Sequence, residues 1–140
     1  MQITRQADYA IRAILFLAEN DPNLRASTSQ IAERKHIPPS FLAKIISQLS
    51  IAGLIHTSRG ARGGVTLARP ADQISIMEVV EAIDGPIALN QCTFSSLQSC
   101  PFGNNCPVHE MWMEAQSHLV EKLKNTTFQD FIEKEQKQLA

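Results

Sequence analysis

The order of hydrophobic patterns along the first 70 residues is the strongest constraint on how this chain folds. Three segments repeat apolar residues with a helical period, and two shorter segments after them are typical of β-strands. The helices are expected at residues 4–19, 28–34 and 39–52, and the strands at residues 54–58 and 64–68. Ser27 and Gln30 form a capping-box pattern, Pro39 suits a first helical turn, and Gly53 suits a helix end. This order predicts a mainly α fold with a small β-hairpin.

The second half of the chain continues with helices on either side of a cysteine-rich loop. A second capping-box pattern, from Ser75 to Glu78, opens a helix expected to end near residue 83. Pro107 opens a longer helix to about residue 124, and a last short helix follows. Apolar residues recur on one face of the longer helix at Val108, Trp112, Ala115, Leu119 and Leu123. Such a stripe is most often core packing.

The net charge of −1 conceals an uneven distribution between the two halves. Residues 1–70 hold nine Lys and Arg against four Asp and Glu, a balance of +5. Residues 71–140 hold four against ten, a balance of −6. This division indicates that one half meets a polyanion while the other does not. The alternative is a chance distribution of solvated charges.

Helix, helix, turn, helix and hairpin is also the order of a winged helix-turn-helix, a fold that suits double-stranded DNA. A helix fits the major groove, and a basic hairpin tip can follow the phosphate backbone or enter a narrow minor groove. The outward polar residues of the third helix are Ser40, Lys44, Ser47 and Gln48. The hairpin tip contributes Arg59, Arg62 and Gly63. We expect these residues to bind DNA; the alternative is a winged helix used for protein contacts.

All three cysteines lie in one polar loop, with the spacing C-x7-C-x5-C-x2-H. They are Cys92, Cys100 and Cys106, and the histidine is His109. Three inert buried thiols are possible, but Ser, Gln, Asn and Gly around them make poor core material. An iron–sulfur cluster, a zinc ion bound by three cysteines and His109, and a thiol redox switch remain open. The loop lacks the close cysteine pair usual in structural zinc sites, whereas long gaps suit a larger cluster.

Other classes of protein are less consistent with the sequence. It lacks C-x-x-C, a phosphate-binding loop and an evident Ser/His/Asp or paired-carboxylate site, so we do not expect an enzyme. No apolar run approaches the roughly 18 residues of a membrane span, and the N-terminus does not resemble a signal peptide. We therefore expect a cytoplasmic protein without a membrane partner, in a compartment where cysteines are kept reduced.

Three motifs of the sequence resemble the Rrf-two family of bacterial transcription regulators. They are Ile3-Thr4-x-x-x-Asp8-Tyr9-Ala10, Pro39-x-x-Leu42-x-x-Ile45-Ile46-x-x-Leu49-x-x-Ala52-Gly53-Leu54-Ile55 and Ser58-Arg59-Gly60-x-x-Gly63-Gly64-Val65-x-Leu67. The resemblance runs over nearly the whole chain. It implies a homodimeric regulator, expected to be a repressor, that binds palindromic operator DNA. It also implies control by an iron–sulfur cluster that senses nitric oxide, redox state or iron, with 4Fe–4S favoured over 2Fe–2S.

The resemblance also implies roles for particular parts of the chain. Residues 1–70 would form the DNA-binding domain, and residues 71–106 the connecting helix and cluster-binding loop. Residues 107–140 would form the dimerisation helix and a C-terminal helix. Because three cysteines leave one ligand position open, Asp8 from the partner subunit is implied as the fourth ligand, with His109 as the alternative. His36 is a weaker candidate. The gap between Cys92 and Cys100 is longer than in the commonest family form.

Overall fold

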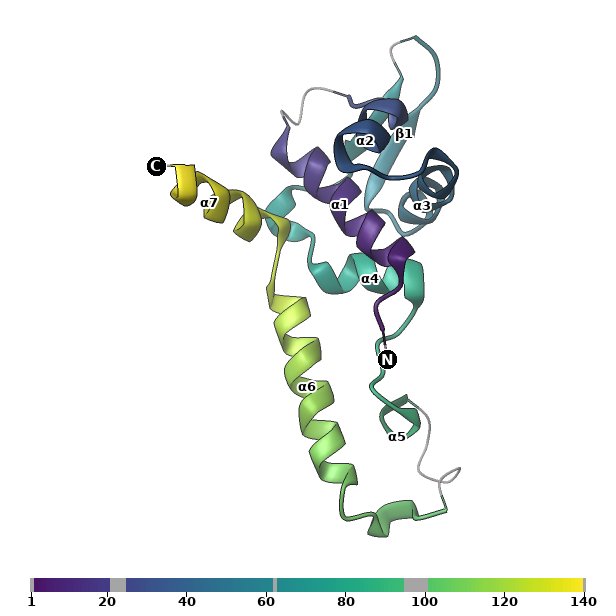
Figure 1. Ribbon diagram of the computed structural model, residues 1–140, viewed down its shortest axis with the longest axis vertical. Coiled ribbons are helices and arrows are strands. Elements are labelled where there is room, and N and C mark those ends of the chain that lie inside the picture. The colour runs from purple at the N-terminus through teal and green to yellow at the C-terminus, as the bar shows by residue number, and fades with distance from the viewer. Residues whose placement is uncertain (1, 21–24, 62, 95–100, 140) are drawn as a thin grey trace.

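The computed structural model describes residues 2–20, 25–61, 63–94 and 101–139, which form a helical body with one helix projecting from it (Figure 1). The body contains α1 (Arg5–Glu19), α2 (Thr28–Lys35), α3 (Pro39–Ile51), β1 (Ile55–Ser58), β2 (Gly64–Leu67), the 3₁₀ turn η1 (Ala71–Gln73), α4 (Ile76–Asp84) and α7 (Phe128–Leu139). The projecting part contains α5 (Gln91–Phe94), the 3₁₀ turn η3 (Gly103–Asn105) and α6 (His109–Asn125).

Helix α1 runs through the middle of the body and packs against α2, α3, α4 and α7. The Thr4 side chain accepts a hydrogen bond from the Ala7 N–H (3.1 Å) and so caps the helix. The buried face combines small and large residues, namely Ala7, Ala10, Ala13, Ile14 and Leu17. Because alanine adds little bulk, neighbouring elements can approach α1 closely on this face.

Helices α2 and α3 form the expected helix-turn-helix. Ser27 and Gln30 complete the capping box at the start of α2, and Pro39 lies in the first turn of α3. His36 ends α2 in the left-handed conformation, with φ of 54°. This non-glycine residue at positive φ makes the chain reverse direction between the two helices.

The wing is an antiparallel hairpin in which Ile55 pairs with Leu67 and Ser58 pairs with Gly64. A third segment joins β2 near the turn end of the hairpin, because Ala26 and Val65 exchange two backbone hydrogen bonds of 3.1 and 2.7 Å. Gly64 is required beside this bridge: its φ is 156°, and a Cβ there would lie 2.8 Å from the Ala26 carbonyl oxygen. The strands were predicted from the sequence, but the Ala26 bridge was not.

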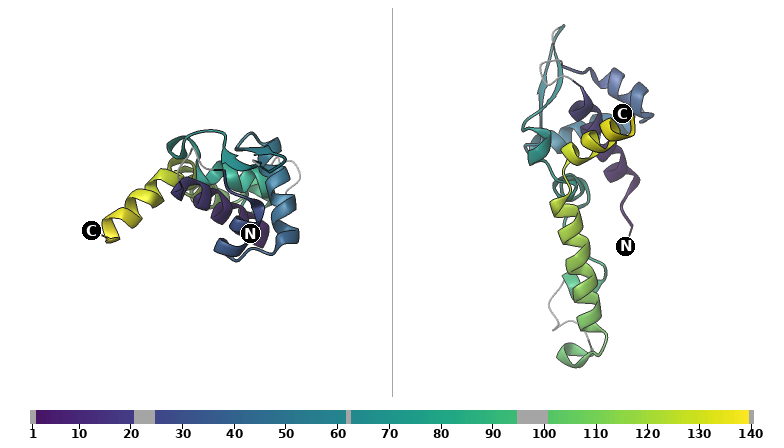
Figure 2. Two further views of the ribbon diagram at one scale, coloured as in Figure 1. Left: turned by 90° about the horizontal axis from the view of Figure 1, so that it is seen from above. Right: turned by 90° about the vertical axis from the view of Figure 1, so that its left-hand side faces the viewer.

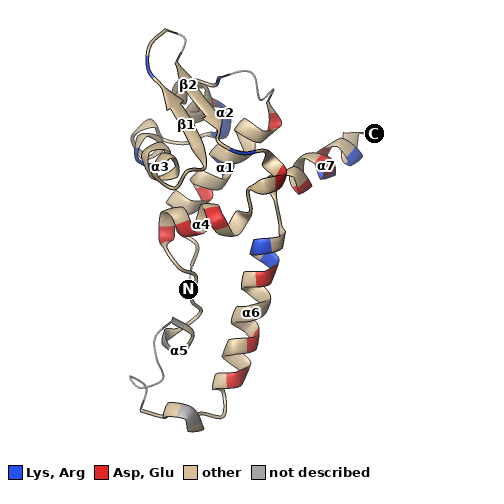
Figure 3. Ribbon diagram, turned by 180° about the vertical axis from the view of Figure 1, so that it is seen from behind, with Lys and Arg blue, Asp and Glu red and all other residues tan. Residues whose placement is uncertain are grey.

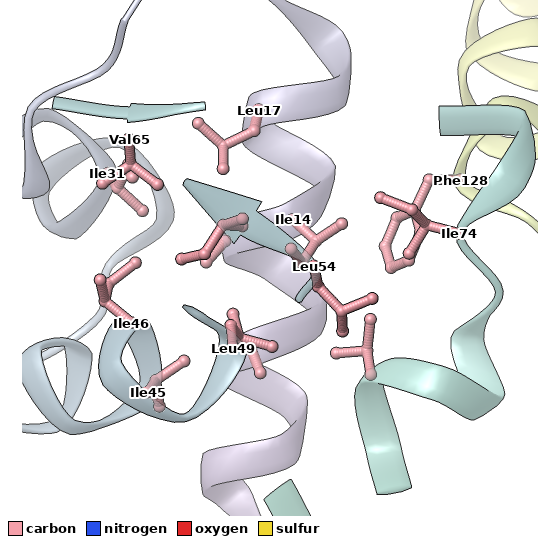
Figure 4. Close-up of a cluster of buried hydrophobic side chains, with 14 of the residues drawn as sticks. Ile14, Leu17, Ile31, Ile45, Ile46, Leu49, Leu54, Val65, Ile74 and Phe128 are labelled. Carbon is pink, nitrogen blue, oxygen red and sulfur yellow. The ribbon is translucent and has the colours of Figure 1, made fainter. Parts of the chain in front are cut away.

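One hydrophobic core joins residues from distant parts of the chain (Figure 4). Ile14, Leu49 and Leu54 come from the first half of the chain, and Ile74 follows η1. Phe128, at the start of α7, is completely buried in the same core. Backbone hydrogen bonds between residues 74–76 and 126–128 hold this end of α7 in place. The core thus includes a residue from the C-terminal helix. The element order and the hairpin confirm the predicted mainly α winged-helix fold.

Helix α4 begins with the second predicted capping box, in which Glu78 accepts a hydrogen bond from the Ser75 N–H (3.0 Å). Glu78 also forms an ion pair with Arg69 (2.8 Å). Partial burial raises the pKa of Glu78, but the Ser75 hydrogen bond and the Arg69 guanidinium outweigh burial and lower the pKa overall.

Helix α6 leaves the body as an arm, and α5 lies beside it (Figures 1 and 2). It begins at His109, two residues after the predicted start at Pro107. None of its residues is buried, although Leu119 and Leu123 pack against the core. Within the described part of the chain, no helix has both the length and the apolar character needed to cross a membrane.

Candidate functional site

Four residues of α3 were predicted to contact DNA bases, and three of them are exposed on its outer face. Ser40, Lys44 and Ser47 are exposed, because the buried stripe of Leu42, Ile45, Ile46 and Leu49 turns the opposite face toward the core. Gln48 is different: it is half-buried, and its Oε1 is enclosed without a hydrogen-bond partner. The exposed set therefore runs from the first turn of α3 to Ser47.

A groove of about 550 Å³ separates α3 from the wing. Hydroxyl side chains from three elements line it, namely Ser27, Thr28, Ser47, Ser50, Thr57 and Ser58. Hydroxyl groups and a helix N-terminus are frequent donors to DNA phosphates. The contribution of Ser27 and Thr28 to this groove was not predicted, although the capping box at Ser27 indicates the start of α2. The sequence signal that could have predicted this contribution is the position of a helix start close to a basic hairpin.

The wing tip is a tight turn that depends on glycine. Gly60 has φ of 98°, and its carbonyl oxygen accepts a hydrogen bond from the Gly63 N–H (2.9 Å). A Cβ at Gly63 would overlap the carbonyl oxygen of Ser58. Arg59 is exposed beside this turn, whereas Arg62 lies outside the described residues. The wing therefore presents at least one of the two predicted arginines on a sharply turned backbone.

Of the cysteine loop, the structure describes Cys92, which lies in α5, and Cys106, which lies between η3 and α6. Cys92 and Cys106 are half-buried, and the Cys92 thiol donates a hydrogen bond to Asn90 Oδ1 (2.9 Å). His109 begins α6, and its Nδ1 is enclosed without a hydrogen-bond partner. Cys100 lies outside the described residues. Among the described residues, no three His, Cys, Asp or Glu side chains lie close enough together to hold a metal ion.

The side chain of Gln116 fastens the segment before Cys92 to α6. Its Nε2 donates to the carbonyl oxygen of Ile87 (2.6 Å), and its Oε1 accepts from the N–H of Leu89 (2.9 Å). Gln116 is half-buried, while its helical neighbours from Met111 to Ala115 are exposed. This role of Gln116 was not predicted, because its partners lie 29 and 27 positions away in the sequence.

Asp8, the predicted ligand from a partner subunit, is exposed on α1 and forms an ion pair with Arg12 (2.9 Å). It lies one turn from Thr4, whose N–H and hydroxyl both donate to the Asp84 carboxylate at the end of α4. This contact joins the start of α1 to the point where the chain leaves the body for the cysteine loop. His36, the weakest candidate ligand, is exposed in the turn between α2 and α3.

Comparison with known proteins agrees with this fold. The Rrf2 family model, described as an iron-dependent transcriptional regulator, matches residues 3–134. A protein of Aquifex aeolicus described as an HTH-type transcriptional regulator is 34% identical over 132 residues, which cover 94% of this chain and 91% of the relative.

Two solved structures give the same result for the fold. CymR of B. subtilis, described as the global cysteine regulator, superposes with a TM-score of 0.81 at 24% identity, covering 95% of this chain and 97% of CymR. An oxidized form of Staphylococcus aureus CymR gives a TM-score of 0.74 at 25% identity, covering 95% and 97%. The relatives are thus transcription regulators rather than enzymes. The chain belongs to the Rrf2 family and is a winged-helix, DNA-binding transcription regulator.

Proposed function

We propose that this regulator is a cytoplasmic homodimer, acting as a repressor, whose operator binding is controlled by an iron–sulfur cluster held by the cysteine loop. The observation that supports the cluster is the set of potential ligands near the first turn of α6. Cys106 lies three residues before His109, whose Nδ1 is enclosed without a partner, and Cys92 lies in α5, which packs against α6; both thiols are half-buried. An enclosed imidazole nitrogen without a protein partner is uncommon unless it serves a ligand or water.

The donor set fits such a cluster. Thiolates are the usual ligands of iron–sulfur clusters, and histidine replaces cysteine in some of them. Cys92, Cys100 and Cys106 would supply three positions, and Asp8 of the partner subunit or His109 the fourth. A 4Fe–4S cluster is favoured over 2Fe–2S because three widely spaced thiolates can each bind a separate iron. When bound, the cluster would supply a centre that reacts with nitric oxide or oxidants and depends on iron supply.

The exposed arm supports assembly with a second copy of this chain. Along α6, Met111, Trp112 and Met113 are 50%, 37% and 42% exposed. Its first turn is acidic and its last turn is basic, with Lys122 and Lys124 there (Figure 3). If two such helices pack antiparallel, the acidic start of each lies against the basic end of the other. The same packing would cover the apolar side chains of both arms.

The loop can influence DNA binding through this chain's own contacts. The Asp84 carboxylate joins the loop-proximal end of α4 to the start of α1 through Thr4. Helix α1 packs in turn against α3, which carries Ser40, Lys44 and Ser47. An ordered loop would therefore fix α1, and through it the spacing of the two recognition helices in a dimer.

The deciding experiment is purification without oxygen, followed by counts of iron, sulfide and zinc and by an absorption spectrum. We expect iron and sulfide in equal amounts, a dimeric mass, and visible absorption that disappears in Cys92→Ser and Cys106→Ser. DNA selected from a random pool should bind with different affinities with and without iron. A colourless protein containing only zinc, or equal affinity in both states, would contradict the proposal.

DNA contacts are tested separately with Lys44→Ala and Arg59→Ala. Each should weaken binding, and binding by the wild-type protein should fall steeply with salt because counterions are released from phosphate contacts. Glu133→Ala on α7, which lies away from α3 and the wing, is the control. An Arg59→Ala protein with wild-type affinity would contradict the role of the wing.

A second candidate is a regulator that switches through thiol chemistry or zinc without a cluster. The similarity to an oxidized form of Staphylococcus aureus CymR favours it, as does the partial exposure of Cys92 and Cys106. It predicts no iron and a DNA affinity that changes on treatment with peroxide or a zinc chelator. Mass spectrometry of the cysteine-containing peptides distinguishes these outcomes.

A further inference from the structure

We propose that Gln116 is a positioning residue for the cysteine site, acting as a clamp that sets the distance between Cys92 and the start of α6. This inference rests on the proposed cluster function. Its basis is the pair of hydrogen bonds from one side chain to the backbone at Ile87 and Leu89 (2.6 and 2.9 Å). No ligand role for Gln116 is involved.

The clamp is placed between the two sides of the site. Gln116 follows His109 by seven residues, which is about two helical turns, so both side chains lie on nearly the same face of α6. Leu89, on the opposite side, precedes Cys92 by three residues. Fixing Leu89 to this face of α6 therefore brings the chain that carries Cys92 beside the helix that begins at His109.

Local hydrogen bonds extend the clamp from Leu89 to the first cysteine. The Asn90 N–H donates to Thr93 Oγ1 (3.3 Å), and the Thr93 hydroxyl donates to the Asn90 carbonyl oxygen (2.8 Å). The Asn90 side chain accepts from the Cys92 thiol (2.9 Å). The segment from Leu89 to Thr93 is thus held as a unit, and Gln116 determines where this unit lies relative to α6.

A primary amide can meet both backbone groups at once. The Ile87 carbonyl needs a donor and the Leu89 N–H needs an acceptor, and a glutamine side chain offers one of each at fixed separation. Glutamate keeps the acceptor for Leu89 but has no donor for Ile87 when ionised. Leucine has neither and is similar in size. The series Gln, Glu, Leu therefore removes the two hydrogen bonds of the clamp stepwise, while the side chain stays similar in size.

The test follows loss of the cluster from anaerobic protein after addition of an iron chelator, by visible absorption. Gln116→Leu should lose the cluster about 10- to 100-fold faster than wild type, the effect typical of groups that orient metal ligands. Gln116→Glu should lie between the two. Gln136→Leu, the same change at an exposed position of α7, should match wild type.

A second measurement uses metal-free protein, so that it does not depend on the cluster. Hydrogen exchange at the Leu89 amide should be at least about fivefold faster in Gln116→Leu, since loss of its acceptor is worth about one net hydrogen bond. The thermal midpoint of folding and the oligomeric mass of each metal-free variant show whether the body remains folded. Normal values together with rapid cluster loss support a positioning role.

The outcomes separate this inference from the proposed function. If wild-type protein holds a cluster and Gln116→Leu loses it at the wild-type rate, the clamp is refuted and the cluster function stands. If wild-type protein binds no iron at all, the proposed function fails, and the role of Gln116 toward a cluster fails with it. Unchanged exchange at Leu89 in the leucine variant would also refute the clamp.

Discussion

Replacing Gly63 with alanine should weaken DNA binding through the wing while leaving the core intact. A Cβ at this position would overlap the Ser58 carbonyl oxygen and lie 2.8 Å from the carbonyl carbon of Arg59 and 2.9 Å from the Gly60 oxygen. All three are backbone atoms, which cannot rotate away as a side chain can. The turn between Gly60 and Gly63 must therefore open, and Arg59 must move with it.

The magnitude follows from what the turn holds. Opening it removes the hydrogen bond from the Gly63 N–H to the Gly60 oxygen, worth about 1 kcal/mol of folding free energy. A displaced arginine contact to DNA is worth about 1–3 kcal/mol, so affinity should fall about 5- to 150-fold. Arg59 and Gly60 are exposed and Gly63 is half-buried, so the free energy of unfolding should fall by no more than about 1 kcal/mol.

The assay is fluorescence anisotropy with a selected DNA duplex, combined with thermal unfolding of each variant. Ala61→Ser, at an exposed position in the same turn, is the control and should bind normally. If Gly63→Ala acts by displacing Arg59, the double variant with Arg59→Ala should bind no more weakly than Arg59→Ala alone. Additive losses, or wild-type affinity in Gly63→Ala, would refute the reasoning.

Four further predictions concern stability and use denaturant unfolding. Phe128→Ala should lower the free energy of unfolding by about 3–5 kcal/mol because it leaves a cavity in the core, whereas Leu139→Ala, at a side chain 89% exposed, should change it by less than about 0.5 kcal/mol. His36→Gly should raise it by about 0.5–1 kcal/mol, since glycine relieves the positive φ; a decrease would contradict this. Thr4→Ala should lower it by about 1 kcal/mol through loss of the α1 cap, and Thr4→Ser should retain most of the stability. Because the folded pKa of Glu78 lies below its unfolded value near 4.5, ionised Glu78 stabilises the fold above that pH, and this contribution is lost as the pH falls through the folded pKa. Glu78→Gln should therefore show a shallower decline in stability below about pH 4.5, and an unchanged decline would contradict the role of this carboxylate.

The helical body and wing could be predicted because their boundaries depend on neighbouring residues. Ser27 with Gln30, and Ser75 with Glu78, each form a cap within one turn, and Gly53 ends α3 with φ of 77°. Such signals act over three or four residues and need no tertiary partner. The exposure of the outer face of α3 follows directly from the helical period.

The contacts that were missed all depend on distant partners. The Ala26 bridge to Val65 involves one residue, which has no periodicity to detect. Gln116 occupies an ordinary polar position in a helix, and only the path of the chain past residues 87–89 gives it a role. Gln48 was predicted from the same α3 pattern as Lys44, but it is half-buried and its Oε1 is enclosed in the folded chain. Hydrophobic periodicity identifies buried faces and does not show which polar residue will be covered.

The burial of Phe128 also affects how this protein emerges from the ribosome. The helix-turn-helix, the wing and the arm are all synthesised before Phe128, but their shared core is closed by that aromatic ring. A nascent chain that ends before α7 lacks this ring, so its body is left with an open apolar site. We therefore expect the helix-turn-helix and the wing to reach their full stability only after α7 has been made. The stability of the body thus depends on both ends of the chain.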